Sequence, residues 1–217
     1  MKKLCLTTLA ALLLTASAFA QSSGNFSATI AKTQCAIDSN GILTGGLTQT
    51  SLSSTVQTPN SSQTALLIRP SLVTGLFTDT NLSSGGGSNK STANAAVNVK
   101  VTIDGNPVAP ATTTNPSIVF DQRFQALSSN ILSQITCVAN STTVPCFIDL
   151  LLSTLSAHSF DFVAPSVGGG SHLLKVEWTL DMSGTNGGTA AACVGPGVIT
   201  VQQVKNFSQS QPITIGP

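Results

Sequence analysis

Two alternating runs, His158-Ser-Phe-Asp-Phe-Val163 and His172-Leu-Leu-Lys-Val-Glu-Trp-Thr-Leu-Asp181, decide the fold that this sequence predicts. Between them lies Ala164-Pro-Ser-Val-Gly-Gly-Gly-Ser171, whose proline and three consecutive glycines are typical of a turn. Apolar and polar residues alternate in both runs, which is the pattern of strands with one buried face. We therefore expect a β-hairpin around the triple glycine.

One pairing of these runs gives an apolar face and an ion pair together. If Phe162 faces Leu174, then Phe160 faces Val176 and His158 faces Trp178. A slip by one residue would destroy this arrangement, so the register is strongly specified. The hairpin therefore predicts a core of five apolar residues and a cross-strand ion pair on the other face. The core residues are Phe160, Phe162, Leu174, Val176 and Trp178, and the ion pair is Asp161 with Lys175.

Residues 1–20 have the pattern of a signal peptide. Lys2 and Lys3 precede an apolar segment that ends near Leu14, and Ala18-Phe-Ala20 forms a small-x-small cleavage site. The apolar segment is shorter than the ~20 residues that span a bilayer, so we expect no membrane span after cleavage. This style of signal is typical of bacterial export, and it predicts a secreted or periplasmic protein.

The remaining residues, 21–217, have the length of one β domain and very few charges. Charged residues make up 8% of the whole chain, against roughly a quarter in typical soluble domains. Without Lys2 and Lys3, 7 basic and 8 acidic residues remain, a net charge of −1. No basic stripe is present, and this argues against nucleic acid as a partner.

Four cysteines follow the signal segment, and an even number in an exported chain predicts disulfides. Cys137 and Cys146 flank a short polar loop, which makes them the expected local pair. Cys35 and Cys193 follow by elimination and would join the start of the chain to its end. A zinc site is the competing interpretation, but the sequence has no Cys-x-x-Cys motif and no nearby histidine to support it.

The rest of the chain also reads as short strands separated by turns. Val97, Val99, Val101 and Ile103 lie on one face of the strongest of these strands. Leu127, Ile131 and Ile135 are spaced as in a helix, which predicts one short helix before Cys137. Three further strands carry a specific expectation: 25–31 has Phe26, Ala28 and Ile30 on one face, 65–68 is ended by Pro70, and 72–77 has a bulge at Gly75. Strands are also expected at 118–124, 147–152 and 198–204. Residues 83–92 are expected to be a flexible loop and 206–217 a loose tail.

Many short strands with turn signals between them predict an all-β fold, an antiparallel two-sheet sandwich. The Cys…Trp…Cys spacing of immunoglobulin domains is not met, so a jelly-roll-like arrangement leads and an immunoglobulin-like one is the alternative. We expect a single domain over residues 21–217.

The titratable residues do not form a catalytic motif in the sequence. No Gly-x-Ser-x-Gly and no His-Glu-x-x-His occurs. His158 is expected at the rim of the core and His172 in a solvated turn, too far apart to share a metal. Asp79-Thr-Asn-Leu-Ser83 begins like a calcium loop, but Ser84 and Lys90 then replace the required Gly and Glu, which favours a turn. Glu177 with Asp161 or Asp149 could be the carboxylate pair of a glycosidase, but an ion pair with Lys175 explains Asp161 better.

These observations predict a non-enzymatic, disulfide-linked module with a structural or interaction role at the cell surface or in the periplasm. Sparse charge leaves sheet edges poorly protected against pairing, so self-association or a cell-surface protein or glycan is the expected partner. No cofactor and no metal are expected. A carbohydrate-binding module is the alternative, although the chain has one Trp and no Tyr to stack on a sugar. A hydrolase using His158 or Glu177 is the third hypothesis.

Overall fold

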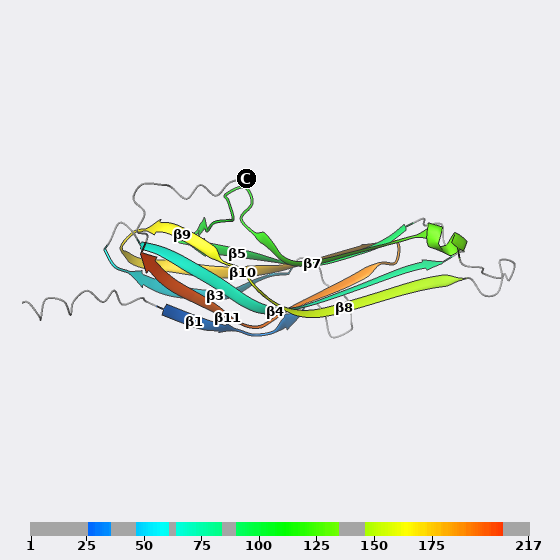
Figure 1. The fold of residues 1–217 in the computed structure, drawn as a ribbon, viewed down its shortest axis with the longest axis horizontal. Helices are drawn as coiled ribbons and strands as arrows, with labels where there is room; N and C mark the ends of the chain where they lie inside the picture. Colours follow the sequence, from blue (N-terminus) through cyan, green and yellow to red (C-terminus); the bar gives the residue numbers. More distant parts are fainter. Residues whose placement is uncertain (1–25, 36–46, 61–63, 84–89, 135–145, 206–217) are drawn as a thin grey trace, which may run out of the picture.

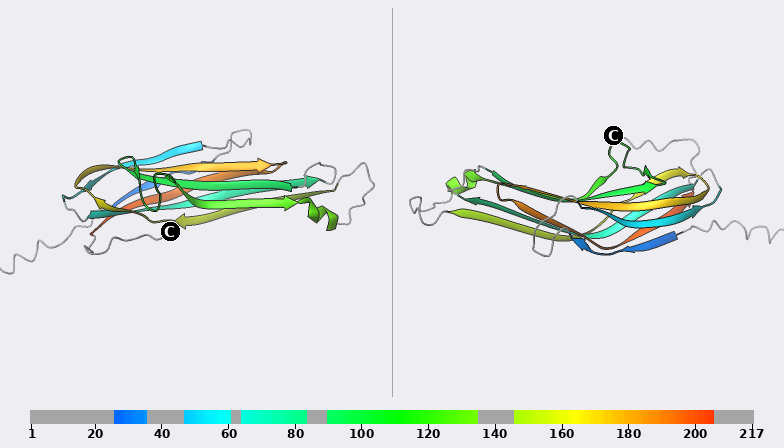
Figure 2. Two further views of the ribbon diagram at one scale, coloured as in Figure 1. Left: turned by 90° about the horizontal axis from the view of Figure 1, so that it is seen from above. Right: turned by 180° about the vertical axis from the view of Figure 1, so that it is seen from behind.

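The computed structural model describes residues 26–35, 47–60, 64–83, 90–134 and 146–205. These residues form two antiparallel β-sheets, which confirms the predicted sandwich. The strands run along the long axis of an elongated molecule (Figure 1), and Figure 2 shows the two layers from two further sides. The strands are β1 (Phe26–Ala31), β2 (Gln34–Cys35), β3 (Leu47–Thr58), β4 (Thr64–Ser83), β5 (Lys90–Ile103), β6 (Asn106–Pro107), β7 (Ile118–Ser128), β8 (Phe147–Ser159), β9 (Phe162–Val167), β10 (Gly170–Thr185) and β11 (Thr189–Lys205).

The first sheet, which we call sheet I, has the order β1-β11-β4-β8, with β2 pairing with β11 and β9 pairing with β4. The second, sheet II, has the order β3-β10-β5-β6, with β7 pairing with β5. The expected strands at 25–31, 95–103, 147–152 and 198–204 are all present, within β1, β5, β8 and β11. The expected loop at 83–92 is shorter, because Ser83 ends β4 and Lys90–Thr92 begin β5; residues 84–89 lie outside the described part.

The inner faces of both sheets share one hydrophobic core. Leu66, Ile68 and Leu72 alternate along β4 and are buried, as are Val97 and Val99 along β5. Successive side chains of a strand point to opposite faces, so a strict alternation of apolar residues places one whole set between the sheets. The long strands thus follow directly from alternation that continues beyond the length of an ordinary strand.

Part of the space between the sheets is polar rather than apolar. The side chain of Gln125 on β7 accepts a hydrogen bond from Thr78 (2.6 Å). Its amide nitrogen donates to the hydroxyl of Thr80 (2.6 Å) and to the carbonyl oxygen of Leu150 (2.7 Å). A buried amide is tolerated only when its groups are paired, and these three bonds satisfy it. They also connect the edge of sheet II to β4 and β8 of sheet I.

The predicted hairpin is not formed, because its two halves lie in different sheets. Phe162 on β9 pairs with Ile68 and His158 on β8 pairs with Leu72, both within sheet I. Trp178 on β10 instead pairs with Val99 within sheet II. Alternation within a strand decides which of its side chains point inward. It does not decide which strand lies beside it, because several strands here share the same apolar pattern.

The inward residues of the predicted hairpin are buried with one exception. Phe162, Leu174, Val176 and Trp178 are at most 3% exposed, so their assignment to the core is correct. Phe160 is 40% exposed, because it lies in the connection between β8 and β9 and outside both strands. The partner assigned to Asp161 is also wrong. Asp161 binds Arg69 of the adjacent strand β4 at 2.5 Å and 2.7 Å, and not Lys175, which lies in the other sheet.

Pro70 lies inside β4 and does not end a strand. The nitrogen of Phe160 donates to the carbonyl oxygen of Pro70 (3.3 Å), so the main chain of Pro70 faces the connection between β8 and β9. The missing N–H of the proline therefore falls where no regular strand needs it. The expected bulge at Gly75 is also absent. Gly75 pairs regularly with Cys193, and the irregularity of β11 lies between Val194 and Gly197.

Residues Ser129–Gln134 form a 3-10 helix, η2, directly after β7. The predicted short helix is therefore present in position, but it is tighter than an α-helix and Leu127 belongs to the strand before it. Ile135 lies outside the described residues. No helix in the described part of the chain is long and apolar enough to cross a membrane.

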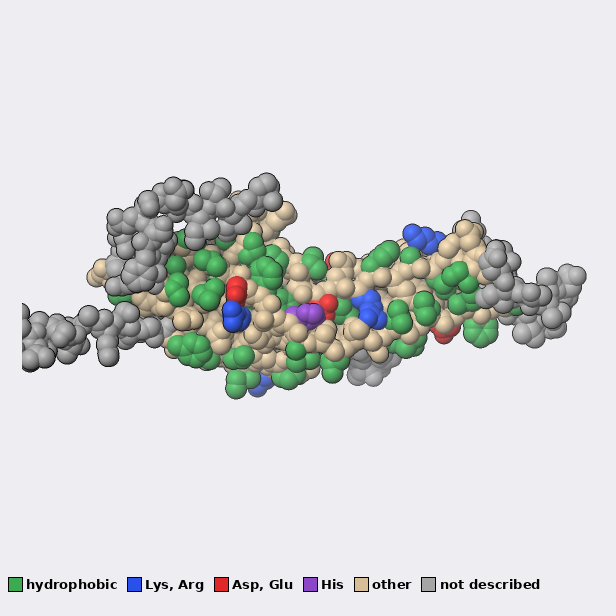
Figure 3. All heavy atoms as spheres, viewed as in Figure 1, with side chains coloured by type: hydrophobic (Ala, Val, Ile, Leu, Met, Phe, Trp, Pro, Cys, Tyr) green, Lys and Arg blue, Asp and Glu red, His purple; other side chains and the backbone are tan. Residues whose placement is uncertain are grey.

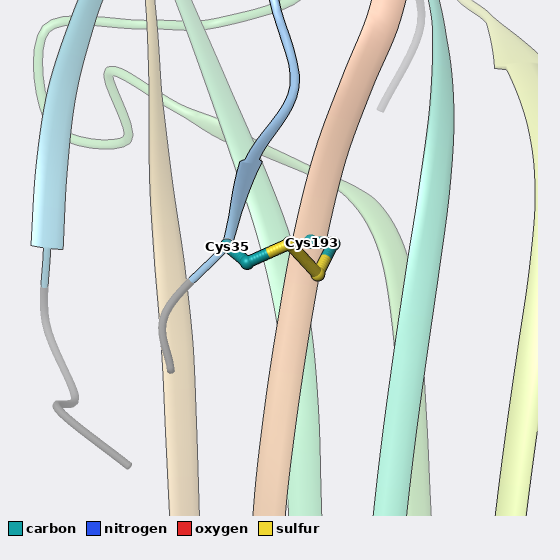
Figure 4. Close-up of a disulfide and its surroundings, with 2 residues drawn as sticks. All are labelled: Cys35 and Cys193. Atoms are coloured by element: carbon teal, nitrogen blue, oxygen red, sulfur yellow. A yellow bond between two sulfur atoms is a disulfide. The ribbon is translucent and has the colours of Figure 1, made fainter. Parts of the chain in front are cut away.

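One disulfide joins Cys35 of β2 to Cys193 of β11 (Figure 4), as predicted. The two residues face each other directly in the register, with a Cα–Cα distance of 4.1 Å. Cys146 is also disulfide-bonded, but Cys137 lies outside the described residues, so the pairing of Cys137 with Cys146 stays a prediction. The signal segment 1–20 and the tail 206–217 lie outside them as well.

Candidate functional site

The structure brings Ser156, His158 and Asp121 together at the edge between β8 and β7. The hydroxyl oxygen of Ser156 lies 2.9 Å from Nε2 of His158, and Oδ2 of Asp121 lies 3.3 Å from the same nitrogen. Thr74 of β4 donates a hydrogen bond to that carboxylate oxygen. The ring of Phe120 meets the imidazole edge-on, with centroids 6.0 Å apart. A serine, a histidine and an aspartate are also the residue types of an acyl-transfer triad.

The geometry of this cluster differs from that of a catalytic triad. In a triad the carboxylate orients the imidazole through Nδ1, which leaves Nε2 free to take the proton of the serine. Here serine and aspartate both contact Nε2, so the aspartate cannot hold the ring for a reaction at that nitrogen. Ser156 and His158 are also neighbours on one face of one strand. His158 therefore lies at the rim of the core, as expected, but it does not face Trp178.

His172 is held in an ion pair at the start of β10. Its Nδ1 lies 2.7 Å from Oδ2 of Asp104, and its Nε2 lies 3.0 Å from the carbonyl oxygen of Gly168. Asp104 and Gly105 have φ of 51° and 84° and turn the chain from β5 to β6. The expectation of a solvated turn residue is wrong, since the side chain of His172 is only 15% exposed. Both partners are acceptors, so the two hydrogen bonds form together only when both ring nitrogens carry a proton, as in the imidazolium form.

The protonation of His172 makes the stability of the fold depend on pH. The hydrogen bond to Asp104 raises the pKa of His172 against the opposing effect of burial, and the bonds from His172 and the Leu173 amide lower the pKa of Asp104. The contribution of His172 to the free energy of unfolding is complete below the ordinary histidine pKa of about 6.5, and it is lost as pH rises through the raised pKa. The aspartate's contribution is complete above about 4 and is lost as pH falls.

We therefore expect the free energy of unfolding to be highest between about pH 4 and pH 6.5 and to fall on the alkaline side. Urea unfolding at a series of pH values measures this profile. In His172→Gln the alkaline decrease should disappear, and in Asp104→Asn it should shrink. An unchanged alkaline slope in His172→Gln would show that another group causes it.

Two carboxyl groups meet on the outer face of sheet I. Asp79 on β4 forms a hydrogen bond with Asp149 on β8, and burial together with this neighbour raises the pKa of Asp79. Its Oδ1 atom is buried without a hydrogen-bond partner. Residues 79–83 are a regular part of β4, so the expected turn is wrong and the resemblance to a calcium loop is accidental. Within the described residues, no group of three or more His, Cys, Asp or Glu side chains could hold a metal ion.

The carboxylates that a glycosidase would need are not brought together. Glu177 lies on sheet II, where its carboxylate is 3.7 Å from the ammonium group of Lys100. Asp149 and Asp161 belong to the side of sheet I, and Asp161 is held by Arg69. Glu177 is thus a cross-strand ion-pair residue, directly opposite Lys100 in the register.

Trp178 does not offer a platform for a sugar ring. It is 1% exposed, and its indole nitrogen donates to the side-chain oxygen of Gln34 (2.7 Å). Two pockets of about 290 Å³ each are present in the described part of the chain, one beside His172 and Pro165 and one between Phe26 and Gln57. Neither is lined by an exposed Trp or by a pair of carboxylates.

The outer face of sheet I is unusually apolar, and the sequence reasoning missed it. Five large hydrophobic residues of β1 and β8 point to this side and are between 58% and 79% exposed, and Ala28, Asp149 and Ser153 lie between them on the same face. Leu67, Val73 and Phe77 of β4 and Val198 of β11 are half-buried on the same side, where polar residues such as Ser71 and Thr200 separate them. In the view of Figure 3, where strands of both sheets are seen, hydrophobic side chains are also spread over the surface with few charged ones among them. We call this surface the apolar face; it comprises Phe26, Ile30, Leu67, Val73, Phe77, Phe147, Leu151, Leu155 and Val198.

The outer face of sheet II is mainly polar by comparison. Besides the ion pair of Lys100 with Glu177, the amide of Gln122 donates to the side-chain oxygen of Asn94 (2.8 Å). Among the residues whose burial is described, its exposed large hydrophobic ones are Val119 and Phe124 at the β7 edge and Leu173 near the start of β10. Contiguous apolar surface on one side of a soluble domain is the usual mark of an interaction site. The structure thus distinguishes one side of the sandwich as the candidate site.

No family model matches the sequence, and the search of curated proteins also finds no match. Solved structures with a similar course of the chain come from infectious bursal disease virus. The Gt strain structure is 14% identical with a TM-score of 0.35, over 85% of this chain and 34% of the viral chain. The Gx strain structure is 12% identical with the same TM-score, over 87% and 33%. The chain spans about a third of those viral chains, and likeness at this level assigns no function.

Proposed function

We propose that this chain is an exported, non-enzymatic structural module that assembles with copies of itself through the apolar face. The observation that carries the proposal is the difference between the two outer faces of the sandwich. Sheet I exposes Phe26, Ile30, Phe147, Leu151 and Leu155, each by more than half of its surface. Burying such side chains is favourable by about 25 cal/mol per Å² of apolar area, which drives association.

Charge also favours contact between identical copies. The sequence after residue 20 carries a net charge of −1, so two copies repel each other very little. Near the apolar face, Arg69 and Asp161 neutralise each other in a bidentate pair. A second copy is therefore an occupant that matches the face in both polarity and charge. Export rests on the sequence pattern of residues 1–20, and the Cys35–Cys193 disulfide is compatible with an extracellular protein.

Analytical ultracentrifugation of residues 21–217 between about 1 μM and 1 mM tests the assembly. We expect the average mass to rise with concentration. The double variant Ile30→Lys with Leu155→Lys places a charge on each of the two edge strands of the apolar face, β1 and β8, and should remain monomeric. Leu173→Lys, a substitution of a similarly apolar exposed residue on sheet II, is the matched control and should associate like the unmodified chain. A protein that stays monomeric at every concentration would contradict the proposal.

A further inference from the structure

Strand β8 has an edge that no described strand covers. It is the last strand of sheet I, and its thirteen residues pair with β4 without a register shift. Natural edge strands are usually protected by lysine, proline, bulges or inward charges. The stretch Phe147-Ile-Asp-Leu-Leu-Leu-Ser-Thr-Leu-Ser-Ala157 has no lysine, no proline and one charged residue, Asp149. With respect to the described residues, its main-chain groups are therefore open to pairing with another strand.

The odd-numbered residues of β8 present their main-chain groups to this open edge. The carbonyl oxygen of Ser156 accepts a hydrogen bond from Thr74 on β4 (3.4 Å), and just beyond β8 the main-chain nitrogen of Phe160 donates to the carbonyl oxygen of Pro70 on β4 (3.3 Å). The main-chain groups of the even-numbered residues therefore lie toward β4. Because the main-chain groups of successive residues in a strand point in opposite directions, the odd-numbered residues from 147 to 155 offer theirs outward.

We propose that β8 pairs with β8 of a second copy, antiparallel and about a two-fold axis at Leu151. This inference rests on the proposed function, and it specifies the β8 edge of sheet I as the place where the two copies meet. In that register Leu151 lies opposite Leu151, Phe147 of one copy lies opposite Leu155 of the other, and Leu150 lies opposite Leu152. Every exposed large apolar side chain of β8 then has an apolar partner. The contact is self-complementary, as a two-fold interface requires.

Other registers pair these residues less well. An axis at Asp149 would place two aspartates directly opposite each other, and like charges in that position are destabilising. An axis at Leu152 would place Asp149 opposite Leu155 and Leu151 opposite Ser153. With the axis at Leu151, Asp149 faces Ser153, whose hydroxyl can donate to the carboxylate. Charge and polarity thus select the same register as the apolar pairs.

The size of the contact fits a weak specific dimer. The five side chains Phe147, Leu150, Leu151, Leu152 and Leu155 are 39% to 79% exposed. At roughly 150 Å² for each large side chain they offer about 400 Å² per copy, and the main chain of the edge adds to this. The total of about 1,000 Å² lies at the lower end of specific interfaces. Five main-chain pairs add about ten hydrogen bonds.

Two substitutions of Ser153 test the register with opposite expected signs. Ser153 is exposed and lies opposite Asp149 of the other copy, and the pair occurs twice in each dimer. Ser153→Lys should lower the dimer dissociation constant by up to about tenfold, because it forms two cross-strand ion pairs. Ser153→Asp should raise the constant by a similar factor, because it opposes like charges. Sedimentation velocity at low salt measures both dissociation constants.

Ala157 provides matched controls on the same strand and the same face. It is exposed like Ser153, but its partner position in this register lies beyond the strand. Ala157→Lys and Ala157→Asp should leave the dissociation constant within about twofold of the unmodified value, so they correct for net charge. Opposite shifts at Ser153 with little change at Ala157 support the inference.

The other outcomes separate this inference from the proposed function. Equal effects of the two Ser153 substitutions would overturn the register. Association that is blocked by Ile30→Lys but unaffected by either Ser153 substitution would overturn β8 pairing and leave assembly through the apolar face standing. A chain that remains monomeric throughout the concentration series would overturn both.

Discussion

Replacing Trp178 by alanine will lower the free energy of unfolding by about 3–5 kcal/mol. The side chain is the largest of the fully buried ones and lies on the inner face of β10, opposite Val99 of the neighbouring strand. Its removal leaves a cavity between the sheets that the surrounding side chains cannot fill. It also removes the hydrogen bond from the indole to Gln34 (2.7 Å). Urea unfolding followed by far-UV circular dichroism measures the loss.

Two further variants separate packing from other effects of the change. Trp178→Phe keeps most of the apolar contact and loses the hydrogen bond, so it should cost clearly less than alanine. Lys175→Ala, on the opposite face of the same strand, should change stability by no more than about 0.5 kcal/mol. A loss below about 1 kcal/mol in Trp178→Ala would mean that the ring is exposed. That result would restore the carbohydrate-binding hypothesis.

Removing the Cys35–Cys193 disulfide is expected to cost about 5 kcal/mol. The bond closes a loop of 158 residues, and in the chain-entropy model stabilisation grows with the length of the loop. It also holds β2 on β11, where only two residue pairs are formed. The variant with both Cys35→Ser and Cys193→Ser should therefore unfold at much lower urea concentration, while the second disulfide remains intact.

This loss should also be visible in the fluorescence of Trp178, the only tryptophan of the chain. Gln34, which accepts the indole hydrogen bond, is the neighbour of Cys35 on β2. Without the disulfide, β2 has little to hold it, so the emission of the folded variant should shift to the red. Gln34→Ala with the disulfide intact is the control for the hydrogen bond alone. A stability loss below about 1 kcal/mol in the double cysteine variant would show that the bond constrains neither state.

Alternation in the sequence predicted the inner faces of the central strands correctly. Val97, Val99 and Val101 on β5 and Leu174, Val176 and Trp178 on β10 are all buried, because these strands have neighbours on both sides and a facing sheet. The strands that pair with β5 and β10 could not be predicted from alternation. The pairing of β10 with β3 and β5 joins residues far apart in the chain, and local pattern carries no information on that choice.

At the edge of sheet I the same alternation placed Phe26, Ala28 and Ile30 correctly on one face, but it did not reveal that this face points outward. Phe26 and Ile30 alternate as in a half-buried strand, yet both point away from the core, and Ala31 is the buried residue of β1. Leu150, Leu151 and Leu152 follow one another, so at least one leucine of this strand had to face outward. Three consecutive leucines in a strand were thus the available signal for the apolar face. The extent of the apolar face could be determined only from the order in which β1, β11, β4 and β8 pair in sheet I.

Hydrogen–deuterium exchange of residues 21–217 at low and high protein concentration tests the central claim most directly. The account predicts that amides of residues 147–155 become protected as concentration rises, since β8 then gains a partner at its open edge. Amides of β10 in sheet II should exchange at the same rate at both concentrations. Protection that appears in sheet II while residues 147–155 remain unchanged would contradict assembly through sheet I.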